Sequence, residues 1–341
     1  MQIRTTRGIV AAVATAAAAA LALAGCASTG SEAPAAGGDA AADFPKIRFG
    51  YIADFNGGSL LAIAEEQGLW EKQGLEVETP VFTNGPLQIQ ALGTNDLDFG
   101  YIGPGAMWLP ASGQAEIAAI NGLGNADRVI AQPGIDSIED LKGKKVAVPE
   151  GTSGDMILTM ALKSAGLTID DVEKVAMDPA TVVSAFSSKQ VDAAGIWYPL
   201  IGTIEQQVPD LEILAENEDF AEEIAFPSAF VVSPAFAEEH PDATEAVLAV
   251  LREAMDYRVE HLDETVELTA AKLKADPKGF AADAANAKYL SATELDELTE
   301  DGTVASWLTG LNEYFVTAGK LDEPTDASTY YLGEQFVAAG K

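Results

Sequence analysis

Residues 144–164 read KKVAVPEGTSGDMILTMALKS, and they combine a strand, a glycine-rich turn and a helix in one unit. The apolar pattern predicts a buried strand over 144–148. The spacing that follows predicts a helix over 155–164, which Gly166 ends. Similar units precede and follow this stretch. Strands and helices that alternate in this way predict an α/β fold with largely parallel sheets.

The units form two series, and a helical region follows them. The first series has expected strands at 46–52, 76–82, 97–101, 117–120 and 128–131, with helices at 60–65, capped by Ser59, and at 86–92. The second opens with a capping box at 137–140. It has expected strands at 144–148, 173–176, 193–197, 212–214 and 229–232, with helices at 155–164, 180–188 and 200–206. Helices are then expected at 243–261, 263–274, 277–289, 293–299 and 303–318.

Composition limits the classes of function. The chain has 341 residues, and 53 acidic against 20 basic side chains give a formal net charge of −33. The hydrophobic share of 48% suffices for a packed core, and about 100–200 residues per domain predicts about two domains. Because so acidic a surface repels phosphate groups, we expect no nucleic-acid partner. One cysteine and two histidines supply neither a disulfide framework nor a usual metal or triad site, so no cofactor or metal is expected.

The N-terminal residues predict the compartment. Arg4 and Arg7 precede an apolar, alanine-rich run, and the run ends at LAGC, residues 23–26. This arrangement is typical of a secretory signal, and LAGC resembles the lipobox of bacterial lipoproteins, in which the cysteine is lipidated. We therefore expect a signal peptide at 1–25, a lipid on Cys26, and a flexible tether at 26–43 rich in Ala, Gly, Ser and Pro. The protein would then be anchored at the outer face of the cytoplasmic membrane.

Loops at the ends of the expected strands are the candidate site. In open α/β sheets, ligands bind outside the carboxyl ends of the strands. Gly103-Pro104-Gly105 and residues 151–154 each precede an expected helix, whose free amide groups suit an anion such as a sulfonate, nitrate or carboxylate. The same loops can be ordinary turns, in which Asp54 and Asp155 only cap helices and the nearby aromatic residues belong to the core. Neither GxGxxG nor GxxxxGK[ST] occurs, so no motif supports nucleotide binding.

Four segments resemble one known family. They are GLWEKQGLEV at 68–77, DLDFGY at 96–101, DLKGKKVAV at 140–148 and QVDAAGIWYP at 190–199. In this order they resemble segments of the substrate-binding proteins that serve nitrate/taurine/aliphatic-sulfonate ABC importers. The resemblance extends from about Ile47 to Glu239, and the C-terminal helices match in pattern only.

The resemblance implies a two-lobe type II periplasmic-binding-protein fold, with a hinge and a ligand cleft between the lobes. Lobe one is expected at 44–131 plus 233–341, and lobe two at 132–232. The implied function is capture of a small solute and its delivery to an ABC permease with a cytoplasmic ATPase. Such a protein is not an enzyme, and its high charge suggests a monomer. Closure of the lobes around the solute would supply the affinity.

The family positions also imply which residues contact the solute. In lobe one these are Asp54, Phe55, Asn84, Gly103, Pro104 and Gly105. In lobe two and near the returning crossover they are Thr152, Ser153, Asp155, Trp197, Tyr198, Phe226, Pro227 and Ser228.

Asp155 departs from the family pattern, in which a histidine or another neutral residue is common. An acid close to a sulfonate is repulsive unless the ligand also carries an amine. We therefore expect a zwitterion such as taurine, whose ammonium group Asp54 or Asp155 would hold. Arg128 is the only arginine in the candidate loops, which makes nitrate a weaker expectation.

Three other interpretations stay open. A thiamine-type pyrimidine precursor could stack on Trp108, Trp197 and Tyr198 while acids bind its amino group. A pyrimidine-forming synthase shares this fold, but its site uses histidines, and His240 and His261 lie outside the candidate loops. A lipoprotein that only signals would have an empty cleft.

Overall fold

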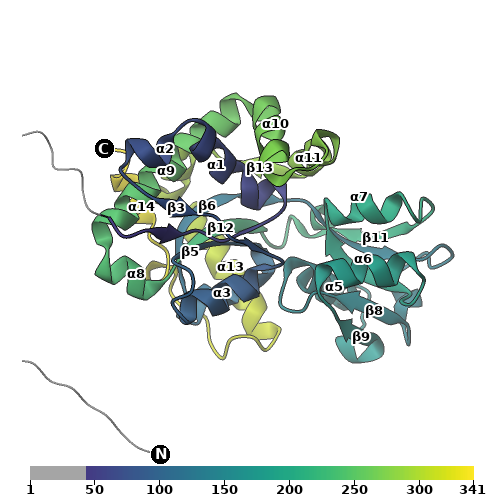
Figure 1. Ribbon diagram of the computed structural model, residues 1–341. Helices are drawn as coiled ribbons and strands as arrows, with labels where there is room; N and C mark the ends of the chain where they lie inside the picture. Colours follow the sequence, from purple (N-terminus) through teal and green to yellow (C-terminus); the bar gives the residue numbers. More distant parts are fainter. Residues whose placement is uncertain (1–43) are drawn as a thin grey trace, which may run out of the picture. The chain divides into compact units, whose positions relative to one another are not determined.

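A computed structural model describes residues 44–341 (Figure 1). The expected signal peptide, the tether and Cys26 lie outside these residues. Within the described part, no helix is both long enough and apolar enough to cross a membrane. The α/β prediction is confirmed, since helices cover two separate sheets.

The first sheet has four strands in the order β13-β6-β12-β5, and every neighbouring pair is antiparallel. Its strands are β5 (Phe99–Ile102), β6 (Glu116–Gly124), β12 (Pro227–Val232) and β13 (Ala287–Tyr289). Two short parallel pairs lie beside it: β1 (Ile47–Arg48) with β3 (Val77–Glu78), and β2 (Tyr51–Ile52) with β4 (Val81–Phe82). A bridge from Phe49 to Phe99 joins them to β5. The rings of Phe49, Phe99 and Phe230 pack together in the core of this lobe.

The second sheet has five strands in the order β11-β7-β10-β8-β9. They are β7 (Asp127–Ala131), β8 (Lys145–Val148), β9 (Glu173–Ala176), β10 (Ala193–Trp197) and β11 (Glu212–Glu216). Alternate residues face opposite ways: Val129 packs in the cluster that contains α5 residues, whereas Ile130 packs in the cluster that contains α6 and α7 residues. Both faces are therefore covered, which explains why these strands are apolar throughout.

Helices surround both sheets. They are α1 (Phe55–Glu66), α2 (Leu69–Lys72), α3 (Gly85–Gly93), α4 (Trp108–Ala111), α5 (Ser153–Ser164), α6 (Pro179–Ser187), α7 (Leu200–Glu205), α8 (Pro234–Glu239), α9 (Pro241–Glu260), α10 (Leu262–Leu273), α11 (Pro277–Ala284), α12 (Ala292–Glu300), α13 (Thr303–Thr317) and α14 (Gly333–Ala338). Figure 1 shows α5, α6 and α7 around the second sheet, while the C-terminal helices return to the first. Helix α1 packs against α9 and α10.

The expectation of largely parallel sheets is only partly right. Parallel pairing occurs where β8 lies between β9 and β10, and in the two short pairs, but the first sheet is antiparallel. The chain leaves the first sheet after β6 and returns through β12. These two crossover strands therefore run in opposite directions beside one another.

The strand pairing also moves both expected lobe borders. Strand β7 was expected in lobe one but pairs with β10 and β11 of the second sheet. Strand β12 was expected in lobe two but pairs with β5 and β6 of the first. By sheet membership the chain passes between the sheets at 125–126 and again at 217–226, and the division into lobes itself stays a prediction.

Two local predictions are wrong. Helix α1 begins at Phe55 rather than after Ser59, because the Asp54 side chain accepts a hydrogen bond from the Gly57 amide at 2.7 Å. Glycine suits position 57, since an added Cβ would lie 2.6 Å from the Ile52 carbonyl oxygen. The helix expected at 277–289 ends at Ala284, and β13 follows it. Pairing of β13 with the edge of β6 outweighs the weak local preference of residues 287–289 for helix.

Candidate functional site

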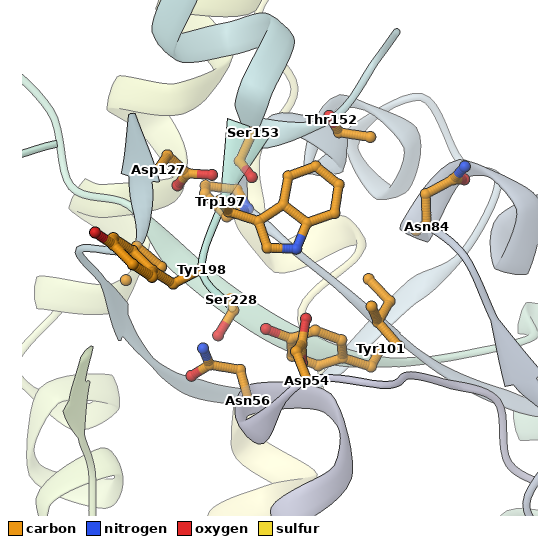
Figure 2. Close-up of a pocket in the computed structure, with 15 residues that line it drawn as sticks. Asp54, Asn56, Asn84, Tyr101, Asp127, Thr152, Ser153, Trp197, Tyr198 and Ser228 are labelled. Atoms are coloured by element: carbon orange, nitrogen blue, oxygen red, sulfur yellow. The ribbon is translucent and has the colours of Figure 1, made fainter. Parts of the chain in front are cut away.

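A cleft lies where strands of both sheets end, and it holds about 510 Å³ of empty space including its open mouth. Figure 2 shows side chains from the two sheets facing each other across it, with Asp54, Tyr101 and Ser228 on one side and Asp127, Ser153 and Trp197 on the other. Of the residues expected from the sequence, eight line this cleft: Asp54, Asn84, Pro104, Thr152, Ser153, Trp197, Tyr198 and Ser228. Residues that sequence reasoning did not select also line it: Ile52, Asn56, Gly85, Tyr101, Gly124, Ala126 and Asp127.

Helix α1 begins at the cleft, and two carboxyl groups cover its N-terminus. Asp54 is its N-cap. The Phe55 amide donates to Asp283 Oδ2 at 2.7 Å, although Asp283 lies 228 residues further along the chain. The partial positive charge of this helix end is thereby met by the protein's own acids. An anionic ligand group finds no unoccupied site there.

Helices α3 and α5 also begin at the cleft, and their ends carry no acid over the first amides. Asn84 caps α3 by accepting from the Leu87 amide at 3.0 Å; its side-chain NH₂ group donates one hydrogen to Thr83 Oγ1 at 3.5 Å and has a second for a ligand. Thr152 precedes α5, but its hydroxyl donates to the Pro149 carbonyl at 2.6 Å and is not free. The first amides of α5, from Ser153 onward, have no partner within the helix. Donors to an anion therefore lie at the starts of α3 and α5.

Two buried acids face the cleft. Burial, together with the charge of Asp127, raises the pKa of Asp54 to about 7. Burial raises the pKa of Asp127 to about 6, although hydrogen bonds from Ser153 and Asn217 and the nearby Arg128 oppose this. Asp127 Oδ2 accepts from Asn217 at 3.2 Å, whereas its Oδ1 is buried and has no partner among the described residues. A cationic ligand group would stabilise the ionised form of both carboxylates.

The aromatic side chains Tyr101, Trp197 and Tyr198 complete the lining. The hydroxyl of Tyr198 donates to Glu205 at 2.8 Å, which fixes its ring. Arg128 lies 5.9 Å from the centre of that ring, but its guanidinium pairs with Glu216 at 3.0 Å and donates to backbone carbonyls. No basic side chain is among the described residues that line the cleft.

The remaining expected residues lie elsewhere. Phe55 is fully buried in a small cluster with Val266 and Phe280, because α1 begins at this residue and turns it inward. Gly103 precedes the turn Pro104–Ala106, and Phe226 lines a separate cavity beside Asn125. Pro227 starts β12.

Gly105 and Asp155 lie in an adjoining groove. Gly105 faces the backbone of Thr152 so closely that an added Cβ would be 2.2 Å from its carbonyl carbon and oxygen. Asp155 is buried and paired with Lys174 at 3.1 Å, and its Oδ2 accepts from the Gly151 amide at 3.0 Å. Its charge is thus satisfied by the protein.

Asn56 had a detectable signal in the sequence and Asp127 had none. Asn56 stands two residues after Asp54, in the stretch between the strand expected at 46–52 and the helix expected at 60–65. Asp127 immediately precedes the strand expected at 128–131, yet an acid at the start of a strand is no site signal without knowledge of the pairing. Tyr101 ends a motif segment at 96–101, where the pattern indicates only a strand.

Comparisons with known proteins agree with this geometry. The family model described as NMT1/THI5 like matches residues 59–265. A protein of Brucella abortus (strain 2308), provisionally named as a binding protein, is 56% identical over 88% of this chain and 94% of its own length. The taurine-binding periplasmic protein of Escherichia coli (strain K12) is 29% identical over 54% of this chain and 58% of its own length. Among solved structures, the alkanesulfonate-binding protein SsuA from Xanthomonas axonopodis pv. citri, bound to MOPS, has a TM-score of 0.66 at 21% identity, covering 85% of this chain and 99% of that one.

The fold and the cleft define a substrate-binding protein of the kind that serves ABC importers. The chain belongs to the NMT1/THI5-like family. The resemblance to the sulfonate and taurine type of binding protein is confirmed. The prediction that the chain is not an enzyme agrees with the names of these relatives, all of which are binding proteins.

Proposed function

We propose that this protein captures a small amine-bearing solute outside the cytoplasm and that the solute is a zwitterionic aminosulfonate, taurine or a close relative. The observation that carries this proposal is the charge pattern of the described lining: two buried acids and no basic side chain. A bare anion would meet two carboxylates without a counter-charge. A solute with an ammonium group relieves the desolvation of both acids.

The two ends of such a solute have different places in the cleft. Asp54 and Asp127 would hold the ammonium group. The side-chain NH₂ of Asn84 and the first amides of α5 would hold the sulfonate. Asp127 replaces Asp155 in this assignment, since Asp155 is already paired with Lys174.

An aminopyrimidine is the second candidate. Tyr101, Trp197 and Tyr198 offer ring faces for stacking, and Asp54 or Asp127 can accept from an exocyclic amino group. This candidate shares the amine requirement with taurine but needs no anionic end.

A calorimetric comparison of three probes tests the proposal. The protein would be the mature chain with Cys26→Ser, titrated with taurine, with 2-hydroxyethanesulfonate and with 4-aminopyrimidine. Taurine should bind at least tenfold more tightly than the hydroxyl analogue, which keeps the sulfonate but lacks the ammonium group. Equal affinity for the two sulfonates would contradict a role for the acids. Binding of 4-aminopyrimidine alone would select the second candidate.

We also propose that Cys26 carries a lipid anchor and that the solute passes to a permease in the same membrane. The support is the position of Cys26 at the end of LAGC, directly behind the apolar run. Detergent phase partition tests the anchor: the wild-type protein should enter the detergent phase and the Cys26→Ser variant should stay in water. A variant that partitions like the wild type would contradict lipidation.

A further inference from the structure

A fully buried arginine lies behind the residues that line the cleft. Arg258, on α9, has no exposed surface, and within residues 44–341 it forms no ion pair. Burial lowers the pKa of its guanidinium to about 10, so it is still charged at neutral pH. Its ring neighbour is Tyr289, at 4.4 Å from the guanidinium carbon to the ring centre. A buried cation without a carboxylate partner is costly, which makes its polar contacts informative.

The guanidinium donates once to Ser59 Oγ, from Nη1 at 3.2 Å, and twice to one asparagine. Nη1 donates to Asn121 Oδ1 at 2.7 Å, and Nη2 donates to the Asn121 carbonyl oxygen at 2.9 Å. Because arginine can only donate, the side-chain atom of Asn121 that faces it must be the oxygen. The orientation of a fully buried amide is thereby determined by the arginine.

The other end of that amide points toward the cleft. Asn121 Nδ2 donates to Ser228 Oγ at 3.2 Å and to the Asn56 carbonyl at 3.3 Å. Ser228 and Asn56 both line the cleft, and Figure 2 shows them beside Tyr101 and Asp54. Since the Ser228 oxygen accepts from Asn121, its one hydroxyl hydrogen is directed away from Asn121.

We propose that Arg258, acting through Asn121, makes Ser228 a hydrogen-bond donor toward the cleft, so that the site selects solutes with an acceptor atom at this point. Both hydrogen bonds in this series are donated in the same direction: the guanidinium donates to the amide oxygen, and the amide NH₂ donates to the hydroxyl oxygen. Arg258 and Asn121 are positioning residues, and Ser228 is the contact. This inference rests on the proposed function only in that the cleft binds a solute, and it adds a donor beside the two acids that accept the amine.

Asn121→Asp separates this role from a purely structural one. The aspartate can still accept both hydrogen bonds from Arg258 and forms an ion pair with it, so we expect the melting temperature to be kept or raised. It cannot donate, and Ser228 would then turn its hydroxyl toward the new carboxylate. We expect taurine affinity to fall about tenfold, as for loss of one buried hydrogen bond. Affinity within twofold of the wild type would overturn the proposal.

A double variant excludes a general charge effect. Ser228→Ala should weaken taurine binding about tenfold by itself. Asn121→Asp combined with Ser228→Ala should be no weaker than Ser228→Ala alone, because both changes remove the same donor. Losses that multiply would show that Asn121 acts through its charge and would overturn the proposed chain.

A ligand-independent measurement keeps the two proposals apart. Neutron diffraction from deuterium-exchanged crystals of the wild-type protein should show deuterium on the Asn121 nitrogen that faces Ser228, and the Ser228 deuterium directed away from Asn121. A Ser228 deuterium directed at Asn121 would overturn this inference whether or not taurine binds. If taurine fails to bind while the neutron result is as expected, the proposed solute fails and the hydrogen-bond chain stands.

Discussion

Helices α1 and α5 begin on opposite sides of one cleft, yet their N-termini have opposite chemical characters. Asp54 and Asp283 both accept hydrogen bonds from the first turn of α1, so its end presents carboxyl groups. The first amides of α5 have no capping side chain and no partner within the helix, and its own acid, Asp155, is bound to Lys174. Helix ends with the same backbone dipole thus offer a ligand acceptors at α1 and donors at α5. The cleft presents both kinds of group, which suits a solute with a cationic and an anionic end.

Replacement of the acid at α1 should have the largest effect. Asp54→Asn removes the charge that would hold the ammonium group and keeps an N-cap of similar quality. We expect taurine affinity to fall about 100-fold, since one partner of a buried charge pair is lost. At pH 5, where Asp54 is mainly protonated, the free energy of unfolding should change by no more than about 1 kcal/mol. Calorimetry and thermal unfolding measure both quantities, and an unchanged affinity would remove Asp54 from the site.

A clash between the lobes should have the next largest effect. In Gly105→Ala the added Cβ meets the backbone of Thr152, at the start of α5, at 2.2 Å. We expect the lobes to stay apart, with an increased radius of gyration in solution scattering and an affinity for taurine at least tenfold lower. Gly310→Ala is the matched control, because a Cβ there meets nothing within 4 Å. Wild-type affinity in Gly105→Ala would mean that this contact is not needed for closure.

The acid pair should make binding depend on pH. The pKa values of Asp54 and Asp127 are about 7 and about 6. Below pH 6 both groups are mainly protonated and neutral. Taurine affinity should therefore rise by up to about 100-fold between pH 5 and pH 8, because pH 5 lies two units below the pKa of Asp54 and each unit corresponds to a factor of ten. Asp54→Asn should flatten this profile, and a wild-type profile that is already flat would argue against both acids.

The same groups should lower the stability of the ligand-free protein as the pH rises. Their folded pKa values lie above the ordinary value near 3.8, so the folded state binds more protons than the unfolded state between pH 4 and pH 7. The free energy of unfolding should accordingly decrease across this window. Denaturant unfolding at pH 5 and pH 7.5 compares the two conditions, and Asp54→Asn should reduce the difference.

The acid at α5 should have the smallest effect on binding. Asp155→Asn breaks the pair with Lys174 but removes no group from the cleft lining. We expect taurine affinity within about threefold of the wild type, together with a lower melting temperature, because it leaves the partly buried Lys174 without this carboxylate. A large loss of affinity would restore Asp155 as the ammonium partner.

Local patterns indicated part of the cleft lining. Thr152 and Ser153 stand in the glycine-rich turn at 151–154, and both line the cleft; Asn84, Trp197 and Tyr198, which also line it, were implied by the family positions. The turn could be found because a turn that joins a strand to a helix has a recognisable composition, and because such turns gather at one edge of a sheet.

The function of each acid could not be inferred in the same way. Asp54, Asp127 and Asp155 look alike in the sequence, since each stands near the start of an element. Their roles depend on distant partners: Asp155 meets Lys174 from a neighbouring strand, and Asp127 meets Asn217, 90 residues away. The sheet membership of β7 and β12 could not be foreseen for a related reason, because these strands join sheets according to pairing that no local pattern encodes.

Periodicity, turn composition and the order of four short segments were enough to establish an α/β binding protein with a cleft at its strand ends. Each of these signals depends on only a few neighbouring residues, so it holds whatever tertiary contacts the segment makes. The polarity of that cleft arises from contacts between segments far apart, such as Asp283 at the start of α1 and Arg258 behind Ser228. Burial in the folded chain then raises or lowers the pKa of each group, so the role of each charge is set only when the helices and sheets have packed.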